Sequence, residues 1–287
     1  MALSCVSTEA NIGASACKKL PQAVKGFIKT PLAFTITAAN AAVLANWQDA
    51  ILAASGVRVH FFPEAYEFEN VSEDTVRATS NLGKEVFVRP GQYRFRVQFR
   101  ENLELHKAMR THLESAGRIF LIDIQGKLIG TSSDDGVTLK GFTLDQFAPE
   151  KMQFGDGSTP STSPVYFTLR DSDELDLNGQ QIEFGTIYSN LKALTTVDLT
   201  IIGTPSSTEI QVKVASALDQ VVLLGLVTAD FTVSTGSVSG VTDANGDGTY
   251  VIAGTGFTSG TVNLVAASAL TVEAFESSGA VAFTVSS

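Results

Sequence analysis

The clearest alternation of apolar and polar side chains runs from Glu85 to Phe99, EVFVRPGQYRFRVQF. It predicts two short strands that turn over at Pro90-Gly91, and a period of two gives the second strand one apolar and one polar face. The apolar face is expected to enter a core and comprises Tyr93, Phe95, Val97 and Phe99. The polar face is expected to point outward and comprises Arg94, Arg96, Gln98 and Arg100.

Two other segments show the period of an amphipathic helix. The first follows Thr37, a suitable N-cap, and closes near Ser55-Gly56 after about seventeen residues. Trp47 lies on its apolar stripe and is expected in the core. The second helix is predicted roughly over Asn102–Ala116, and both helices are expected to pack on a sheet.

Three further segments predict strands of the same domain. Arg118–Gly130 is typical of a hairpin that turns at Gln125-Gly126, and its fully apolar first strand favours the middle of a sheet. Val137–Leu144 and Val165–Leu169 also show strand patterns. With about eight strands and two helices, this part of the chain is predicted to be α+β, mainly β.

Polar segments separate these elements. Glu64–Lys84 is acidic and polar, and a connection of this length in a compact domain is expected to bind or to reach a neighbour. Gly155–Pro164 is rich in Gly, Ser, Thr and Pro, which indicates a flexible loop. Asp171–Asp176, DSDELD, is an acidic run that suits either a solvated loop or a contact with arginines of an adjacent subunit.

The composition changes near Leu191–Thr200. Beyond it Gly, Ser, Thr, Val and Ala dominate, arginine disappears, and strand-like runs recur about every ten residues between turn residues. This pattern predicts a separate all-β sandwich of about ninety residues.

The totals describe a folded and acidic protein. The chain has 287 residues, of which 44% are hydrophobic and 17% charged, and its formal net charge is −10. Because tight binding of nucleic acid depends on neutralising phosphates, this charge disfavours a protein that grips nucleic acid. An acidic surface does suit a wall past which nucleic acid slides without sticking.

Arginine is concentrated against this acidic background. One interpretation is a solvated strand face with cross-strand charge pairs. The other is a sheet face that meets another protein surface, because guanidinium groups form bidentate pairs with carboxylates at interfaces. The second interpretation predicts a subunit interface made by Arg89, Arg94, Arg96 and Arg100 with Asp171, Asp173 and Glu174.

No cluster of residues indicates catalysis, and we expect no enzyme, no cofactor and no metal site. The sequence has no GxSxG, HExxH, GxxxxGK[ST] or helix-opening GxGxxG motif. Asp243–Gly248 begins like a calcium loop, but Gly254 occupies the twelfth position, where an EF-hand has a bidentate carboxylate. We therefore interpret this segment as a turn.

The N-terminal region contains both cysteines, Cys5 and Cys17, and the sequence leaves open whether they form a disulfide. This region lacks a basic segment followed by an apolar run, so no signal peptide is predicted. No stretch has the eighteen or so apolar residues of a membrane span. The sequence thus predicts a soluble protein made in the cytoplasm, without a membrane partner.

Two sets of residues carry a resemblance to known families. Asp230–Ser234 and Thr242–Tyr250 resemble bacterial immunoglobulin-like domains of the invasin and intimin type, which commonly decorate phage virion proteins. The first 190 residues resemble structural proteins of tailed phages that infect Bacteroidetes. The segments that carry this second resemblance are Gly26–Pro31, the arginine strand, Leu128–Thr131 and Leu139–Phe142.

The resemblance implies a virion subunit made in the host cytoplasm, and specifically a tail tube (major tail) protein. Such subunits form stacked hexameric rings around a DNA channel, contact other virion proteins, and carry an immunoglobulin-like domain outside. The implied organisation is an N-terminal arm over residues 1–30, a tube-like β-sandwich or barrel domain with two helices over 31–195, and an immunoglobulin-like domain over 196–287. The alternative is a capsid-associated, decoration or adhesin protein that binds surfaces through the last domain.

Overall fold

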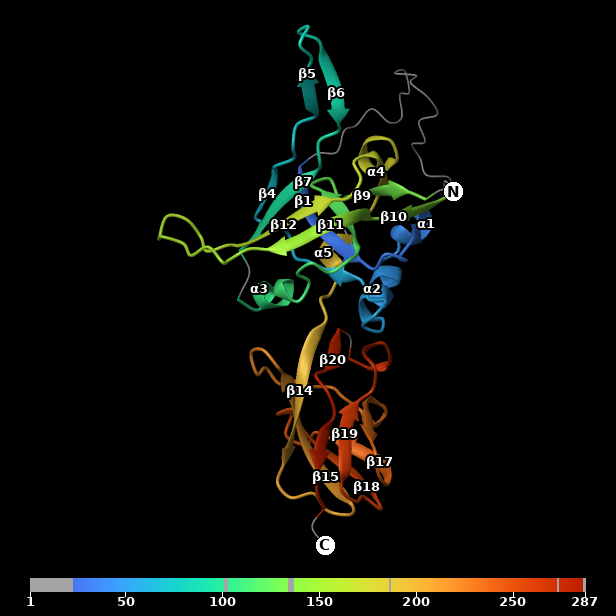
Figure 1. Cartoon of the computed structure of the whole chain (residues 1–287). Coiled ribbons are helices and arrows are strands. Elements are labelled where there is room, and N and C mark those ends of the chain that lie inside the picture. Colours follow the sequence, from blue (N-terminus) through green and yellow to red (C-terminus); the bar gives the residue numbers. More distant parts are fainter. Residues whose placement is uncertain (1–22, 101–102, 134–136, 186, 273, 286–287) are drawn as a thin grey trace. The chain divides into compact units, whose positions relative to one another are not determined.

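Strands dominate the computed structural model, which describes residues 23–100, 103–133, 137–185, 187–272 and 274–285 (Figure 1). Strand accounts for 44% of it and helix for 13%, so the prediction of a mainly β, α+β chain is confirmed. The chain divides into two compact units between Leu191 and Lys192, with residues 52–54 grouped with the second unit. This division falls a few residues before the predicted boundary between residues 195 and 196.

The first unit is built on an 11-stranded sheet that includes β1–β4 and β7–β13. The bounds of these strands are β1 (Val24–Thr30), β2 (Ile36–Thr37), β3 (His60–Phe61), β4 (Glu67–Asn70), β7 (Arg94–Phe99), β8 (Arg118–Asp123), β9 (Lys127–Ser132), β10 (Thr138–Lys140), β11 (Phe142–Pro149), β12 (Ser163–Leu169) and β13 (Gly179–Glu183). A separate two-stranded ribbon joins β5 (Val76–Thr79) and β6 (Glu85–Arg89). The helices of this unit are α1 (Ala38–Ala41), α2 (Leu44–Leu52), α3 (Leu103–Arg110), α4 (Asp173–Asp176) and α5 (Ile187–Asn190).

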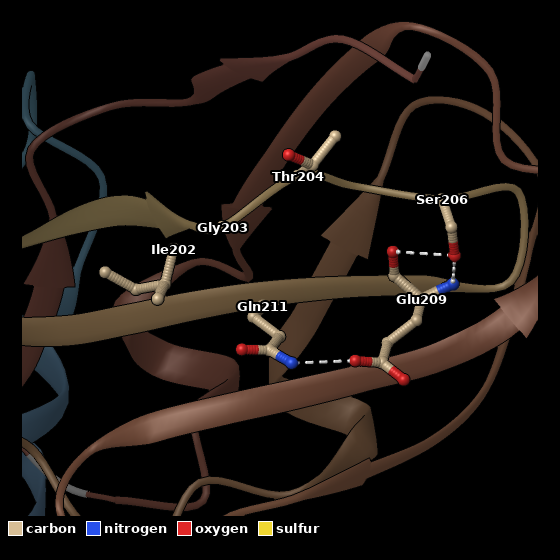
Figure 2. A pocket seen from close by; sticks show the side chains of 6 residues that line it. All are labelled: Ile202, Gly203, Thr204, Ser206, Glu209 and Gln211. Atoms are coloured by element: carbon tan, nitrogen blue, oxygen red, sulfur yellow. Dashed lines mark hydrogen bonds between the residues drawn. The ribbon is translucent and has the colours of Figure 1, made fainter. Parts of the chain in front are cut away.

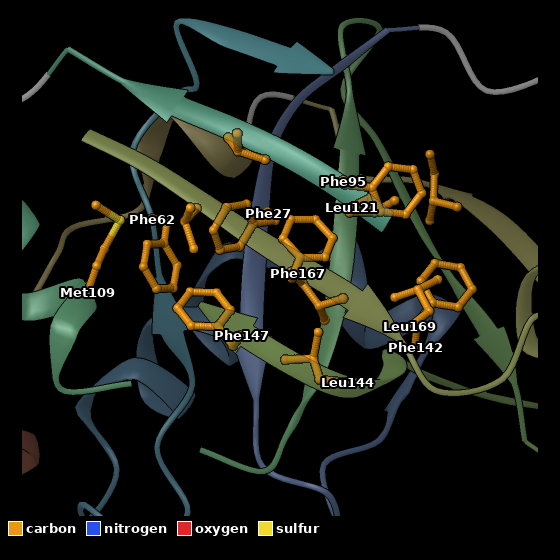
Figure 3. Close-up of a cluster of buried hydrophobic side chains, with 14 of the residues drawn as sticks. Phe27, Phe62, Phe95, Met109, Leu121, Phe142, Leu144, Phe147, Phe167 and Leu169 are labelled. Carbon is orange, nitrogen blue, oxygen red and sulfur yellow. The ribbon is translucent and has the colours of Figure 1, made fainter. Parts of the chain in front are cut away.

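Strand β11 connects the two halves of the large sheet. Phe142 and Thr143 at its start pair with β8, whereas its later residues pair with β12. The sheet can therefore curve around one interior, while Phe120 on the opposite face of β8 packs against Trp47. That interior is filled mainly by aromatic side chains (Figure 3), namely Phe27, Phe62, Phe95, Phe99, Phe142, Phe147 and Phe167. Burying this much aromatic surface is the main stabilising contribution that the first unit can gain.

The N-terminal strand belongs to this core. Val24–Thr30 pairs with β8 along its length, and Phe27 and Ile28 are fully buried. The predicted arm over residues 1–30 is therefore wrong for residues 24–30. These residues do not alternate between apolar and polar, because both faces of the strand are covered. Residues 1–22, with both cysteines, lie outside the described part of the chain.

The predicted helix after Thr37 is interrupted. Thr37 acts as the N-cap, its Oγ1 accepting a hydrogen bond from Asn40 N at 3.2 Å, and Trp47 is fully buried as expected. However, α1 ends at Ala41, and α2 begins at Leu44. The Ala41 carbonyl accepts a hydrogen bond from the indole N–H of Trp47 at 3.0 Å, which gives this buried donor the partner it needs. The second predicted helix is also shorter and ends at Arg110.

The predicted hairpin at Gln125-Gly126 is confirmed, with Gly126 at a φ of 74° and β8 in the interior of the sheet. The predicted hairpin at Pro90-Gly91 is wrong. Strand β7 pairs with β4 and β12, and β6 pairs with β5. The segment 64–84, predicted as a loop, supplies both β4 and β5. The chain thus forms one long hairpin from Glu67 to Phe99 instead of a short one.

The second unit has two sheets around its own core. The five-stranded sheet has the order β17-β18-β15-β14-β20 and the three-stranded sheet the order β16-β19-β21. The bounds are β14 (Thr195–Ile202), β15 (Glu209–Ser216), η2 (Thr228–Asp230), β16 (Phe231–Val233), β17 (Ser237–Thr242), β18 (Thr249–Thr255), β19 (Gly260–Leu264), η3 (Ala267–Ala269), β20 (Phe275–Ser277) and β21 (Val281–Phe283).

Two buried polar side chains tie the loops of this unit to its core. The Tyr250 hydroxyl donates to Leu223 O at 2.8 Å and accepts from Leu226 N at 3.3 Å. The fully buried Asp230 accepts from the Thr271 backbone N–H at 2.7 Å and from the Thr271 hydroxyl at 2.6 Å. The carboxylate of Asp243 accepts from Gly246 N and Gly248 N within its own loop, as a turn requires.

Two histidines and a lysine lie close together at the turn that follows α3. The rings of His60 and His112 are 4.3 Å apart, and the nearly buried Lys29 donates to the Ser115 hydroxyl at 2.9 Å. Burial lowers the pKa of both histidines to about 4, with Lys29 adding to the effect. Both imidazoles are therefore neutral at pH 7.

This cluster predicts acid sensitivity of the first unit. The unfolded histidines titrate near 6.5 and the folded ones near 4, so the unfolded state takes up more protons as the pH falls through this window. The free energy of unfolding should decrease from pH 6.5 towards pH 4. Urea unfolding followed by the fluorescence of Trp47, the single tryptophan, measures it. Substituting both histidines with glutamine should make the dependence shallower, and an unchanged slope would contradict the assignment.

Candidate assembly surface

The long hairpin from Glu67 to Phe99 has a sheet-bound base and a free tip. At its base β4 pairs with β7, and hydrogen bonds from Val71 N to Arg94 O and from Glu73 N to Gln92 O continue the ladder. Beyond them, the β5–β6 ribbon extends away from the sheet (Figure 1). The hairpin turns at Ser80–Lys84, where Gly83 has a φ of 73° and donates to Ser80 O.

Pro90-Gly91 marks the place where the hairpin leaves the sheet. Pro90 has no N–H and cannot contribute to a ladder. Gly91 lies so close to the other arm that a Cβ atom would be 1.9 Å from the carbonyl oxygen of Glu73. The dipeptide that suggests a turn in the sequence is therefore a break between two paired regions of the same hairpin.

The ribbon carries apolar side chains that the described chain does not cover. Val86, Phe87 and Val88 are 53%, 63% and 55% exposed, and Leu82 at the tip is 87% exposed. Ala78 and Val86 are opposite partners on one face, whereas Arg77 and Phe87 are opposite partners on the other. Both faces of the ribbon are thus left with apolar surface exposed to solvent.

Little within the chain stabilises this ribbon. Its ion pairs, Arg77 with Glu85 at 3.1 Å and Arg89 with Glu73 at 3.3 Å, join side chains that are more than half exposed. Exposed pairs of this kind contribute about 0–1 kcal/mol. A two-stranded ribbon without a packed face is marginal in water, and its free edges favour pairing with another chain. The ribbon has the properties of a surface that a partner completes.

The arginines of β7, and Arg100 directly after it, mostly have partners within the chain. Arg96 lies between Glu69 on β4, at 3.6 Å, and the ring of Tyr166 on β12, at 5.7 Å. Arg94 lies over the same ring at 4.9 Å, and Arg100 over Tyr66 at 5.0 Å. Arg94 and Arg100 are exposed and form no ion pair with another described residue. Gln98, predicted to point outward, is instead buried against Thr162.

In the acidic run Asp171–Asp176, some carboxylates bind other residues of the chain and others stay exposed. Glu174 accepts from Arg118 Nη1 at 3.1 Å and from the Thr143 hydroxyl at 2.8 Å, with its own side chain only 16% exposed. Asp176 accepts from the Tyr93 hydroxyl, a contact that raises the pKa of Tyr93 to about 12. Asp171 and Asp173 stay exposed.

The predicted interface set is therefore only partly free to meet another subunit. Glu174 is already paired with Arg118 within its own chain, and its assignment to an interface stays a prediction. Arg89 and Arg96 form the cross-strand charge pairs of the simpler interpretation. For the remaining residues, a contact between subunits also stays a prediction; these are Arg94, Arg100, Asp171 and Asp173.

The sequence analysis did not identify the exposed apolar side chains of the ribbon. The pattern that could have indicated them is the run VFV in Glu85–Arg89, in which apolar and polar residues do not alternate. In a strand of a large sheet this run indicates burial on both sides. In a two-stranded ribbon it leaves both sides exposed, and the pairing partner decides between the two outcomes.

A polar hollow of about 210 Å³ lies at the β14–β15 turn of the second unit (Figure 2). Polar groups that line the hollow form hydrogen bonds with one another. Gln211 donates to the Glu209 carboxylate at 2.8 Å, and Glu209 N donates to the Ser206 hydroxyl at 3.0 Å. The described residues contain no group of three or more His, Cys, Asp or Glu side chains placed to hold a metal ion. Among them, too, no helix has the length and apolar character that crossing a membrane requires.

Comparison with known proteins adds no constraint. No family model, no curated protein and no solved structure matches this chain.

The internal role of Glu174 predicts a stability effect. Glu174→Gln leaves Arg118 without a charged partner in a site where both side chains are about 15% exposed. We expect a loss of about 2–3 kcal/mol, somewhat less than for a fully buried pair. Urea unfolding measures it, and Asp173→Asn on the same helix should change stability by less than about 0.5 kcal/mol. Equal effects of the two substitutions would contradict this assignment.

Proposed function

We propose that this chain is a structural virion subunit that assembles with copies of itself, and specifically the tail tube (major tail) subunit of a tailed phage. In this role it forms stacked rings around a channel for DNA and contacts other virion proteins. The observation that carries the proposal is the β5–β6 ribbon, which exposes apolar side chains on both faces and whose edges are unpaired within the described chain.

The charge distribution supports assembly through this ribbon. Copies of a chain with a formal net charge of −10 repel one another, so contacts between them are least opposed where the charge is locally balanced. Residues 71–91 contain three acids and three bases, giving a net charge of zero. The acidic remainder would keep the assembly soluble and would not retain DNA in a channel.

The second unit supports a role outside the assembly contact. It has its own hydrophobic core, which includes Val212, Tyr250 and Val262, and its own pair of sheets. A unit that folds around a separate core can be displayed without taking part in the ring. This is the arrangement that the resemblance to virion decoration domains implies.

Purified protein should self-associate into rings or tubes as its concentration increases. Replacing Phe87 with serine should weaken association by about tenfold or more, as expected for the loss of an aromatic anchor worth over 1 kcal/mol. Sedimentation velocity and negative-stain images measure this. The matched control is Leu177→Ser, which removes an exposed apolar side chain elsewhere on the same unit. A protein that stays monomeric at all concentrations and binds only preformed capsids would contradict the proposal.

Removal of the second unit should leave assembly intact. A chain that ends at Leu191 keeps the whole aromatic core and the ribbon of the first unit. We expect the same particles by negative stain, without the density of the second unit. Loss of assembly in a truncated chain whose Trp47 fluorescence still reports a folded core would assign the contacts to the second unit instead.

A further inference from the structure

The turn that follows α3, residues 111–117, packs against the aromatic core of the first unit. The ring of His112 lies 6.0 Å from Phe62 and 6.4 Å from Phe147, measured between ring centroids. Both phenylalanines belong to the core, as does Met109 of the preceding helix (Figure 3). Most other side chains of the turn are exposed, so the turn covers this part of the core from outside.

Two backbone hydrogen bonds connect the turn to β11. Glu114 N donates to Phe147 O, and Leu144 N donates to Gly117 O, each at 3.0 Å. Glu114 has a φ of 55°, a left-handed conformation that is strained for a residue other than glycine. The contacts with the strands therefore hold the turn in a shape that its own backbone does not favour.

Three bases meet where the turn lies against the strands. Lys29 is only 4% exposed and donates to the Ser115 hydroxyl at 2.9 Å, and the rings of His60 and His112 are 4.3 Å apart. Lys29 and His60 are opposite partners on the paired strands β1 and β3, whereas His112 belongs to the turn. Repulsion among these bases therefore acts between fixed strands and a weakly attached segment.

Among the described residues, no carboxylate offsets the charge of these bases. Lys29 makes the potential at both imidazoles more positive, and Arg58, shortly before β3, does so at His60. From β11 the cluster meets the uncharged ring of Phe147, which lies 5.9 Å from Lys29 Nζ. The neighbouring elements α3, the turn, β8 and β11 carry further titratable side chains, none of which shifts the pKa of either imidazole; these are His106, Lys107, Arg110, Glu114, Arg118 and Asp145.

We propose that residues 111–117 form a lid that opens in acid. When His60 and His112 take up protons, the turn detaches from β3 and β11 and uncovers Phe62 and Phe147, while the strands stay paired. The lid is tethered by α3 at one end and by β8 at the other, so it can open without unfolding the sheet. Opening does not depend on self-assembly, since none of these residues belongs to the ribbon.

Burial sets the direction of the pH dependence. In the closed turn burial lowers the pKa of both histidines to about 4, whereas the ordinary value is 6.5. Between these two values the open form therefore binds more protons than the closed form, and opening becomes more favourable as the pH falls from 6.5 towards 4. Above pH 7 the imidazoles are neutral in both forms, and the contacts keep the lid closed.

Hydrogen exchange in the full chain measures the opening. The amide hydrogens of Glu114 and Leu144 join the turn to β11, so they exchange when the lid opens. We compare pH 7 with pH 5.5, which lies above the isoelectric point of about 4.8. Relative to the intrinsic rate at each pH, exchange of these two amides should become about tenfold faster or more at pH 5.5.

Amides in the ladder between β1 and β8 serve as the internal reference and should stay protected at both pH values. An equal loss of protection in this ladder and in the turn would mean that the whole unit unfolds, and would overturn the lid. Unchanged exchange of Glu114 and Leu144 would overturn it as well.

Substitutions assign the effect to the histidines. His112→Gln and His60→Gln each keep a neutral polar side chain and should reduce the pH dependence of exchange. Lys29→Met loses one hydrogen bond to the turn, so exchange should be faster at both pH values but differ less between them. The matched control is His106→Gln on α3, a histidine that forms none of these ring contacts, and its exchange should match the wild type. Trp47 fluorescence at pH 7 verifies that each variant is folded.

The full pH dependence in a folded His112→Gln chain would overturn the assignment of the lid to this cluster. If that chain does not fold, Lys29→Met decides in its place, because an undiminished pH dependence there would exclude repulsion among the three bases as the cause of opening.

Discussion

The packing of Phe27 against other phenylalanines is the interaction on which the first unit depends. Its ring lies 4.5 Å from Phe62, 5.8 Å from Phe99, 6.2 Å from Phe147 and 5.5 Å from Phe167, measured between ring centroids. These contacts join β1 to β7, β11 and β12, which are far apart in the sequence. Because these strands are fixed by aromatic rings, the segments that extend beyond the core are free to differ without loss of that core.

The ribbon depends on this core for its position. Its two arms continue β4 and β7, and β7 is held inside by Phe95, Val97 and Phe99. The base is thus anchored to the core, while the tip is stabilised only by exposed ion pairs within the chain. A projection that is positioned by buried aromatic packing and left apolar at its end is organised for contact with another molecule.

Acidic residues that are close together in the sequence have different environments in the structure. Glu174 and Asp176 hold α4 to the sheet through Arg118 and Tyr93, while Asp171 and Asp173, a few residues away, stay in water. His60 and His112, which are remote in sequence, meet beside Lys29 and have depressed pKa values. The first unit therefore couples its stability to pH through groups that are separate from the proposed contacts.

The sequence by itself determined the elements that depend on local periodicity. These include the buried face of β7, the hairpin at Gln125-Gly126, the cap at Thr37, the burial of Trp47 and the mainly β composition. Only the tertiary structure decided which strand pairs with which, because pairing is a long-range choice that alternation along one strand does not encode. For this reason Val24–Thr30 joined the core, Pro90-Gly91 became a break instead of a turn, and Glu174 met Arg118. The same choice left the apolar run of β6 in water, which is the feature on which the proposed assembly rests.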